Sequence, residues 1–173
     1  MDIYEQMKQM LARLAGVGDT GGAKMAEEKK PMTLDEVNAY MQEKCGFVPR
    51  MFKIINTVTP EPGRTFADFY ATIFGDGAVS KKHKELMFMA IGVSYCSPRC
   101  IIHVIPAINA GATTMEVFES AAVGMIGAGF VPSGPGIPYA FEYALKCLDI
   151  DKKYRAGEKW EYLPETKFDR GVY

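Results

Sequence analysis

The sequence predicts an all-α fold of roughly seven or eight helices, and three observations support this prediction. No segment alternates between polar and apolar residues with the period of two that marks a half-buried strand. Apolar residues instead recur every three or four positions, between the start and stop signals that are typical of helices. At 173 residues, 48% of them apolar, the chain is long enough for one domain with a substantial core.

Composition divides the chain into three segments. Residues 1–30 contain a predicted amphipathic helix over 2–15, followed by a glycine-rich and charged stretch, 16–30, that predicts a flexible linker. Residues 31–150 form the helical domain, and residues 151–173 form a polar tail with scattered aromatic residues. The amphipathic helix is predicted from five apolar residues at helical spacing: Ile3, Met7, Met10, Leu11 and Leu14.

The first three helices of the central segment have recognisable boundaries. A capping box at Thr33–Glu36 opens a helix that runs to about Cys45. Residues 46–49 end this helix and start another, which continues to the next break. The sequence Pro60-Glu61-Pro62-Gly63 predicts a turn, and an aromatic-rich helix follows over about residues 64–74.

The next helix begins after Ser80, a favourable N-cap, and is apolar on every side from Leu86 to Val93. Such a helix is expected to be a central, fully buried element. A further helix is predicted to start at Ser97-Pro98 and to end at Asn109-Ala110-Gly111, which is a C-cap pattern.

Two helices are predicted in the last part of the domain. A second capping box, at Thr113–Glu116, opens a helix of small residues that runs to about Gly129. Residues 131–138 contain three prolines and two glycines and are expected to form a loop. Residues 138–149 again have a helical pattern.

The segment with the most reactive side chains runs from Tyr95 to His103. It holds two of the four cysteines and one of the two histidines. Cys96 precedes the predicted helix, Cys100 lies in its first turn, and His103 lies one turn further on, so the three share one face. Backbone N–H groups and the dipole at a helix N-terminus favour a thiolate over a thiol. Glu85 precedes Cys96 by eleven residues, close to a whole number of turns, which places its carboxylate along the same stripe.

A longer pattern surrounds these residues. It comprises Gly46-Phe47-Val48-Pro49, residues 80–90, and the run from His103-Val104 to Ala110-Gly111-Ala112-Thr113. From about Gly46 to Leu148, the chain resembles the carboxymuconolactone decarboxylase family, specifically its alkylhydroperoxidase D-like branch. In that family, a buried helix with a Glu leads into a Cys-x-x-Cys-x-x-x-His segment and then an Ala-Gly-Ala-Thr turn.

The chain departs from this family pattern at two positions. Cys96 and His103 keep the family's separation, but the second cysteine is Cys100, and an arginine stands in its usual place. Glu85 is one residue nearer than the family's Glu, because Lys84 occupies the expected position.

The resemblance implies a compact helical bundle that usually assembles into oligomers, and a thiol–disulfide oxidoreductase or peroxidase-like activity. Cys96 and Cys100 would act as a disulfide switch, while His103 and Glu85 would relay protons. No cofactor is expected, and the partners would be a small oxidised substrate and a thiol or dithiol reductant. The resemblance favours Cys100 as the attacking cysteine, whereas accessibility favours Cys96, which precedes the helix.

The spacing of the two cysteines bears on whether they can form a disulfide. Residues four apart on a regular helix have Cβ atoms about 5–6 Å apart, whereas a disulfide needs roughly 3.5–4.5 Å. Pro98 removes most of this difficulty, because Cys96 precedes the helix and its backbone can swing inward. A strained bridge would also be easily reduced, which suits a switch.

Two other functions fit the same residues. Zinc accepts the side-chain types of Cys96, Cys100, His103 and Glu85 as ligands. If these residues bind a metal or another small ligand, the protein would be a non-catalytic oligomeric binding protein. Structural zinc sites usually draw ligands from two separated segments, whereas one helix supplies three of these, so we prefer the redox interpretation. A decarboxylase or lactone-processing enzyme ranks third, because the decarboxylase branch typically lacks the cysteine pair.

Charge and hydropathy set the remaining expectations. A net charge of −1 gives no electrostatic reason to expect nucleic acid or an anionic membrane as a partner. The longest apolar run, residues 86–93, is too short to cross a bilayer, and no signal peptide is visible, so we expect a cytoplasmic protein. There, cysteines more often serve catalysis or metal binding than disulfide frameworks, although Cys45 and Cys147 have apolar neighbours and are expected in the core. The apolar helix, the separate N-terminal helix and the aromatic-bearing tail together predict a homo-oligomer.

Overall fold

The computed structural model describes residues 31–132, 134 and 136–160, and these residues form an all-helical structure. They contain seven α-helices, labelled α2 to α8, two short 3-10 helices, η1 and η2, and no strand. The prediction of an all-α fold is therefore confirmed. The predicted helix over 2–15, its linker and residues 161–173 lie outside the described residues. None of the described helices is both long and apolar enough to span a membrane.

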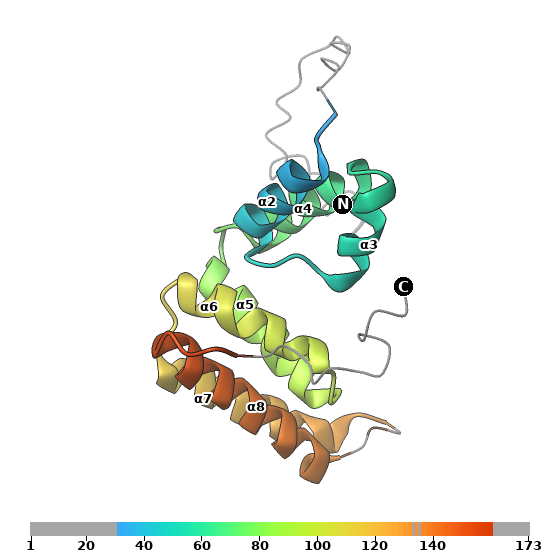
Figure 1. Cartoon of the computed structure of the whole chain (residues 1–173). Helices are drawn as coiled ribbons and strands as arrows, with labels where there is room; N and C mark the ends of the chain where they lie inside the picture. The colour runs from blue at the N-terminus through green and yellow to red at the C-terminus, as the bar shows by residue number, and fades with distance from the viewer. Residues whose placement is uncertain (1–30, 133, 135, 161–173) are drawn as a thin grey trace, which may run out of the picture.

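The helices form two groups, one above the other in Figure 1. The upper group consists of α2 (Leu34–Cys45), α3 (Arg50–Val58) and α4 (Glu61–Phe74). The predicted capping box at the start of α2 is present, with Thr33 and Glu36 each bonding to the other's backbone N–H. This group encloses its own small core: Val37, Met41, Cys45, Phe52, Ala67 and Tyr70.

The predicted turn at residues 60–63 is wrong, because α4 already begins at Glu61. Pro62 lies in the first helical turn, where a backbone N–H has no intrahelical partner and proline is therefore tolerated. Gly63 faces the buried Asn56 of α3, and a Cβ at this position would lie 2.3 Å from the Asn56 Oδ1. The glycine therefore permits close helix packing here.

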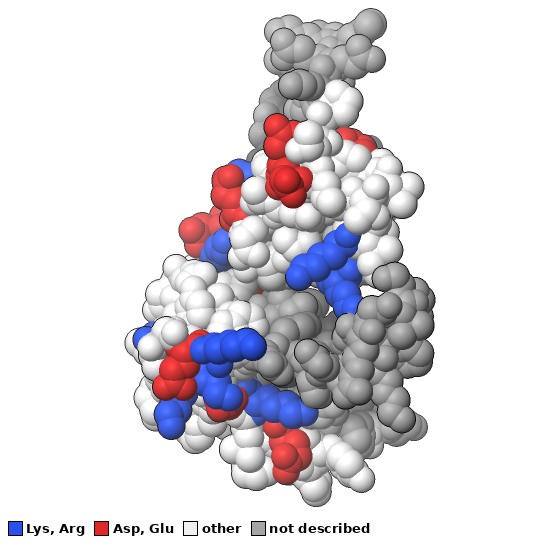
Figure 2. All heavy atoms as spheres, viewed as in Figure 1, with Lys and Arg blue, Asp and Glu red and all other residues white. Residues whose placement is uncertain are grey.

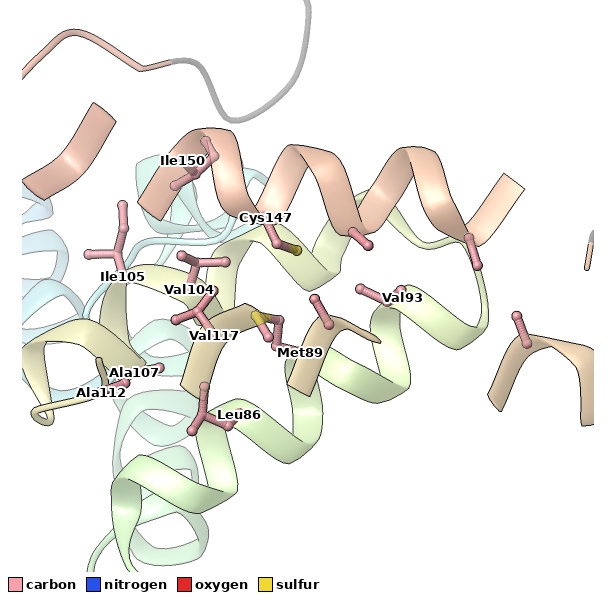
Figure 3. Packing of buried hydrophobic residues seen from close by; sticks show 14 residues of the cluster. Leu86, Met89, Val93, Val104, Ile105, Ala107, Ala112, Val117, Cys147 and Ile150 are labelled. Carbon is pink, nitrogen blue, oxygen red and sulfur yellow. The ribbon is translucent and has the colours of Figure 1, made fainter. Parts of the chain in front are cut away.

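The lower group is built on three long helices, α5 (Lys81–Ser94), α7 (Thr114–Gly127) and α8 (Ile137–Arg155). The 3-10 helix η1 (Pro98–His103) and α6 (Val104–Asn109) connect α5 to α7, and η2 (Ala128–Phe130) follows α7. Side chains from all three long helices meet in the larger core, as Figure 3 shows. Its bulkiest fully buried members include Met89, Val93, Val104, Val117 and Cys147.

Helices α5 and α7 run parallel and touch backbone to backbone. Near their N-termini, the Lys82 Nζ lies 2.6 Å from the Glu116 Oε1. Further along, the Ser94 hydroxyl donates to the Gly124 carbonyl over 2.7 Å. Gly124 lies so close to Ala90 that no side chain fits between the two helices. This contact fixes the position of α5, which carries Glu85.

The segment after Ser97 differs from the continuous α-helix that was predicted. It begins as the 3-10 helix η1 and becomes α-helical only at Val104. Pro106 explains the change, because in a continuous α-helix its ring would clash with the Ile102 carbonyl. Starting α6 at Val104 places Pro106 in the first turn, where proline is tolerated. The predicted C-cap is confirmed, with Gly111 at a φ of +90°.

The end of α8 depends on long-range contacts, and the burial of α5 differs from the prediction. Helix α8 continues to Arg155, beyond the predicted end at about residue 149. Asp151 is buried there, accepting from the Thr114 hydroxyl over 2.8 Å and from the Arg155 Nε over 2.9 Å. The expectation that α5 is fully buried is wrong, because Met87 and Ile91 are 57% and 50% exposed. Among the described elements, α7, η1, α6 and α8 pack on α5, but they leave Met87 and Ile91 uncovered.

Charged side chains are unevenly spread over the surface. In the view of Figure 2, charged side chains, many of them acidic, gather over α2, basic ones lie over α3, and acidic and basic ones together lie over α8. Acidic residues are concentrated near the start of α2 and basic residues in the last turn of α8. Both placements complement the helix dipole.

Replacing Gly124 with alanine tests the close contact between α5 and α7. The added Cβ would lie 2.4 Å from the Ala90 carbonyl oxygen, so the helices must separate. We expect a net fall of about 1–2 kcal/mol in the free energy of unfolding, after allowing roughly 1 kcal/mol for the better helix propensity of alanine. Gly129→Ala is the control, because its Cβ would meet the Ile137 side chain at 3.4 Å. Urea denaturation measures both variants, and equal stabilities would contradict the tight contact.

Candidate functional site

The structure brings together two of the four predicted site residues, Glu85 and His103. Glu85 lies in the second turn of α5, and His103 is the last residue of η1. The His103 Nδ1 lies 2.8 Å from the Glu85 Oε2, and the two residues are 4% and 0% exposed. A buried carboxylate is costly unless it is paired and hydrogen-bonded, so this contact stabilises both residues.

A third residue, Tyr70 of α4, completes the site. Its hydroxyl lies 2.9 Å from each Glu85 carboxylate oxygen and 3.3 Å from the His103 Nδ1. The sequence does not single out Tyr70, because it lies among the other aromatic residues of its helix. The one available signal was a polar group among phenylalanines, because a buried tyrosine hydroxyl usually requires a hydrogen-bond partner.

The donors and acceptors of this network indicate the tautomer of His103. An ionised carboxylate only accepts, so Glu85 takes one hydrogen bond from the Tyr70 hydroxyl and one from the His103 Nδ1–H. In a neutral imidazole with a proton on Nδ1, Nε2 carries the lone pair. Both hydrogen bonds of His103 to described residues use Nδ1. Nε2 is therefore the nitrogen that can accept a proton from a reacting group.

Aromatic rings enclose the imidazole of His103. The ring centroids of Phe88, Phe74 and Phe47 lie 4.4, 5.7 and 5.8 Å from its own. Phe88 is partly exposed and separates His103 from solvent on the α5 side. Such surroundings limit access of water and strengthen the hydrogen bonds that remain.

Burial changes the acidity of two groups beside Glu85. Burial, followed by the negative charge of Glu85, raises the pKa of the Cys45 thiol to about 12. The same two causes, together with the hydrogen bond to Glu85, raise the pKa of Tyr70 well above its ordinary value. Tyr70 is therefore a hydrogen-bond donor at neutral pH, and Cys45 stays an unreactive thiol. Cys45 and Cys147 are both fully buried, as predicted.

Cys96 has an unusual backbone conformation at the end of α5. Its N–H donates to the Val93 carbonyl over 2.9 Å, and the N–H of Ser97 donates to the Gly92 carbonyl over 2.8 Å. These bonds define a Schellman cap, in which the position of Cys96 usually belongs to glycine. Cys96 has a φ of +50° and is the one non-glycine residue with positive φ in the described part of the chain. Its side chain is half-buried against the lower core.

Cys100 lies within η1, three residues before His103. The structure describes the backbone of Cys100 but not its side chain. A 3-10 helix has three residues per turn, which places positions 100 and 103 directly above one another. The alignment of these two positions is therefore closer than in the α-helix that the sequence predicted.

The remaining candidate ligands do not form a metal site among the described side chains. Within that set, which includes Glu85, Cys96 and His103 but not the side chain of Cys100, no three His, Cys, Asp or Glu residues are placed to hold a metal. His83, the other histidine, is exposed and contacts the Ser80 hydroxyl.

Comparison with known proteins assigns no family: no protein-family model, curated protein or solved structure matches this chain.

The strain at Cys96 can be measured by substitution. A non-glycine residue in the left-handed region costs about 1–2 kcal/mol, and glycine avoids most of this cost. We expect Cys96→Gly to unfold at a higher urea concentration than Cys96→Ala, by about 1 kcal/mol in the free energy of unfolding. Cys147→Gly and Cys147→Ala are the matched control pair. Cys147 lies in the middle of α8, where the glycine variant should be the less stable of the two. Equal stability of the two Cys96 variants would contradict a strained cap.

The raised pKa of Cys45 predicts a loss of stability at alkaline pH. The unfolded thiol titrates near 9.0 and the folded one near 12. Between these values the unfolded chain has lost a proton that the folded protein keeps, so the free energy of unfolding falls by about 1.4 kcal/mol per pH unit for this group. Tyr70 contributes in the same direction from about pH 10 upward.

Urea denaturation at pH 8, 9.5 and 10.5 measures this effect. Cys45→Ala should be less stable at pH 8, because it leaves a cavity, but its stability should fall less steeply above pH 9. Parallel pH dependences of the wild type and Cys45→Ala would show that Cys45 does not retain its proton.

Proposed function

We propose that this protein is a thiol–disulfide oxidoreductase of peroxidase type, with an alkylhydroperoxidase D-like fold. The observation that carries the proposal is the buried hydrogen bond between His103 and Glu85. It lies at the end of the same 3-10 helix in which Cys100 is placed one turn earlier. A cysteine position aligned with an oriented histidine is the basic requirement for thiolate chemistry.

His103 acts as the base through Nε2. Glu85 holds the proton on Nδ1, and its charge stabilises the imidazolium that forms when Nε2 takes a second proton. Tyr70 keeps its own proton and donates to Glu85, so it positions the carboxylate without joining the proton transfer. The surrounding aromatic rings keep competing water away from the pair.

The reaction with a hydroperoxide then proceeds in three steps. The Cys100 thiolate attacks the O–O bond, which gives a sulfenic acid on Cys100 and releases an alcohol that takes the proton from His103. The Cys96 thiol attacks the oxidised sulfur, so that a disulfide forms and water leaves. A dithiol reductant finally restores both thiols and is itself oxidised to a disulfide.

The conformation of Cys96 supports its role as the resolving cysteine. It lies between α5 and η1, in a left-handed conformation that costs free energy. Strained backbone of this kind persists when the surrounding structure imposes it, and it often accompanies function. A disulfide closed through a strained residue is more easily reduced, which suits a bond that must open in every cycle.

Serine substitutions separate the two cysteines. Cys100→Ser should abolish peroxide-dependent oxidation of a dithiol, whereas Cys96→Ser should allow one attack and trap a sulfenic acid or mixed disulfide. Stopped-flow measurement of turnover and mass spectrometry of the trapped adduct report these outcomes. Cys147→Ser, in the core of α8, is the control and should keep turnover. Trapping on Cys100→Ser instead would reverse the two roles, and full activity in the double variant would exclude thiol redox chemistry.

Metal binding is the second candidate function, because the Glu85–His103 contact also resembles a carboxylate that orients a metal-binding histidine. If zinc is bound, chelation should release about one metal ion per chain and lower the melting temperature. For the redox function, the purified protein should contain little metal and chelation should leave the melting temperature unchanged. Metal analysis and thermal denaturation of the same sample distinguish the two functions.

A further inference from the structure

One side of the α5–α7 pair carries exposed apolar side chains from both helices. Each of these side chains is between 50% and 84% exposed. Within each helix they are spaced by three or four residues, so each set lies on one side of its helix. We define the outer α5–α7 face by six residues. Met87 and Ile91 lie in α5 and Tyr95 is its C-cap, while Val123 and Ile126 lie in α7 and Phe130 lies in η2.

The register of the two helices makes this face continuous. Because α5 and α7 are parallel and in contact at Ala90 and Gly124, Ile91 and Val123 lie on either side of the seam. The buried residues of the same helices, such as Met89 and Val117, point toward α8 (Figure 3). The outer face therefore points away from the core, and no described helix covers it.

The size of the face exceeds what a monomer usually leaves exposed. Aromatic side chains present about 150–250 Å² each and aliphatic ones somewhat less, so six that are 50–84% exposed contribute on the order of 700 Å². The largest apolar patch of a typical monomer is about 300–600 Å². A standard-size interface buries about 800 Å² on each partner. The outer face thus has the area that one side of a stable complex requires.

The chemistry of the face indicates the kind of partner. None of its six residues is charged, so two copies of the face meet without electrostatic repulsion. The nearest charged residues on the same sides of the two helices are Lys84, three residues before Met87, and Glu119, one turn before Val123. The Lys84 Nζ already donates to the carbonyls of Ile73 and Gly75. A two-fold interface places the same surface on both subunits, so it requires an apolar and neutral surface such as this one.

We propose that a second copy of this chain docks on the outer α5–α7 face. The α5–α7 pairs of two subunits then pack against each other as a four-helix layer, with Ile91 and Val123 near its centre. This proposal does not depend on the redox function, and it explains why α5 is apolar on every side.

The mass of the purified protein in solution tests this proposal. We expect a dimer or a larger even-numbered assembly at micromolar concentration by multi-angle light scattering. Ile91→Lys and Val123→Lys should each halve the mass, because a lysine at the centre of the interface must be desolvated. Ile54→Lys is the matched control, since Ile54 is 63% exposed on α3 and lies in the other helix group. All three variants should keep the wild-type helix content by circular dichroism.

A charge-swap experiment identifies the partner as the same face of a second copy. Ile91→Glu alone should also have half the wild-type mass, whereas an equimolar mixture of Ile91→Glu and Ile91→Lys should regain the wild-type mass. A monomeric wild type, or Ile91→Lys and Val123→Lys variants with unchanged mass, would overturn the proposal. A mixture that stays at half the wild-type mass would exclude the face-to-face arrangement.

Discussion

The hydrogen-bonded group of Tyr70, Glu85 and His103 connects parts of the chain that otherwise have separate cores. Tyr70 belongs to the upper helices, and Glu85 and His103 belong to the lower ones (Figure 1). A carboxylate that is fully buried must have hydrogen-bond donors, and each helix group supplies at least one. The position of α4 relative to α5 therefore depends on the same contacts that orient the histidine, so fold and site have a common physical basis.

Cys45 and Cys96 lie in different surroundings. Cys45 is enclosed beside Glu85, where loss of solvation and a nearby negative charge both disfavour a thiolate. Cys96 lies at the junction of two helices, half-buried and held in an unfavourable backbone conformation. Proximity to a histidine–carboxylate pair is thus not enough to make a cysteine reactive. What distinguishes Cys96, a proposed redox cysteine, from the buried Cys45 is its position at the junction of two helices.

Local chemistry made most helix boundaries predictable, whereas long-range contacts decided the rest. The capping boxes at Thr33 and Thr113 each involve residues three apart, so the sequence shows them directly. Glu85 and His103 were recognisable from spacing and residue type. Tyr70 was not recognisable, because its hydrogen-bond partners lie fifteen and thirty-three residues away and no local pattern indicates them. The early start of α4 and the 3-10 form of η1 follow from prolines whose effect depends on their exact turn within a helix.

Helix α5 shows why an apolar sequence does not by itself identify a buried helix. Its residues face three different environments, and each environment favours apolar side chains for a different reason. Met89 and Val93 pack into the core with α8, and Phe88 covers the imidazole of His103. Met87 and Ile91 face outward, where the described chain provides no cover. The all-round apolar pattern therefore reflects a core, a site wall and an uncovered surface on one helix, and hydropathy alone cannot separate them. Only the register against α7, set by the contact of Gly124 with Ala90, assigns each residue to its side.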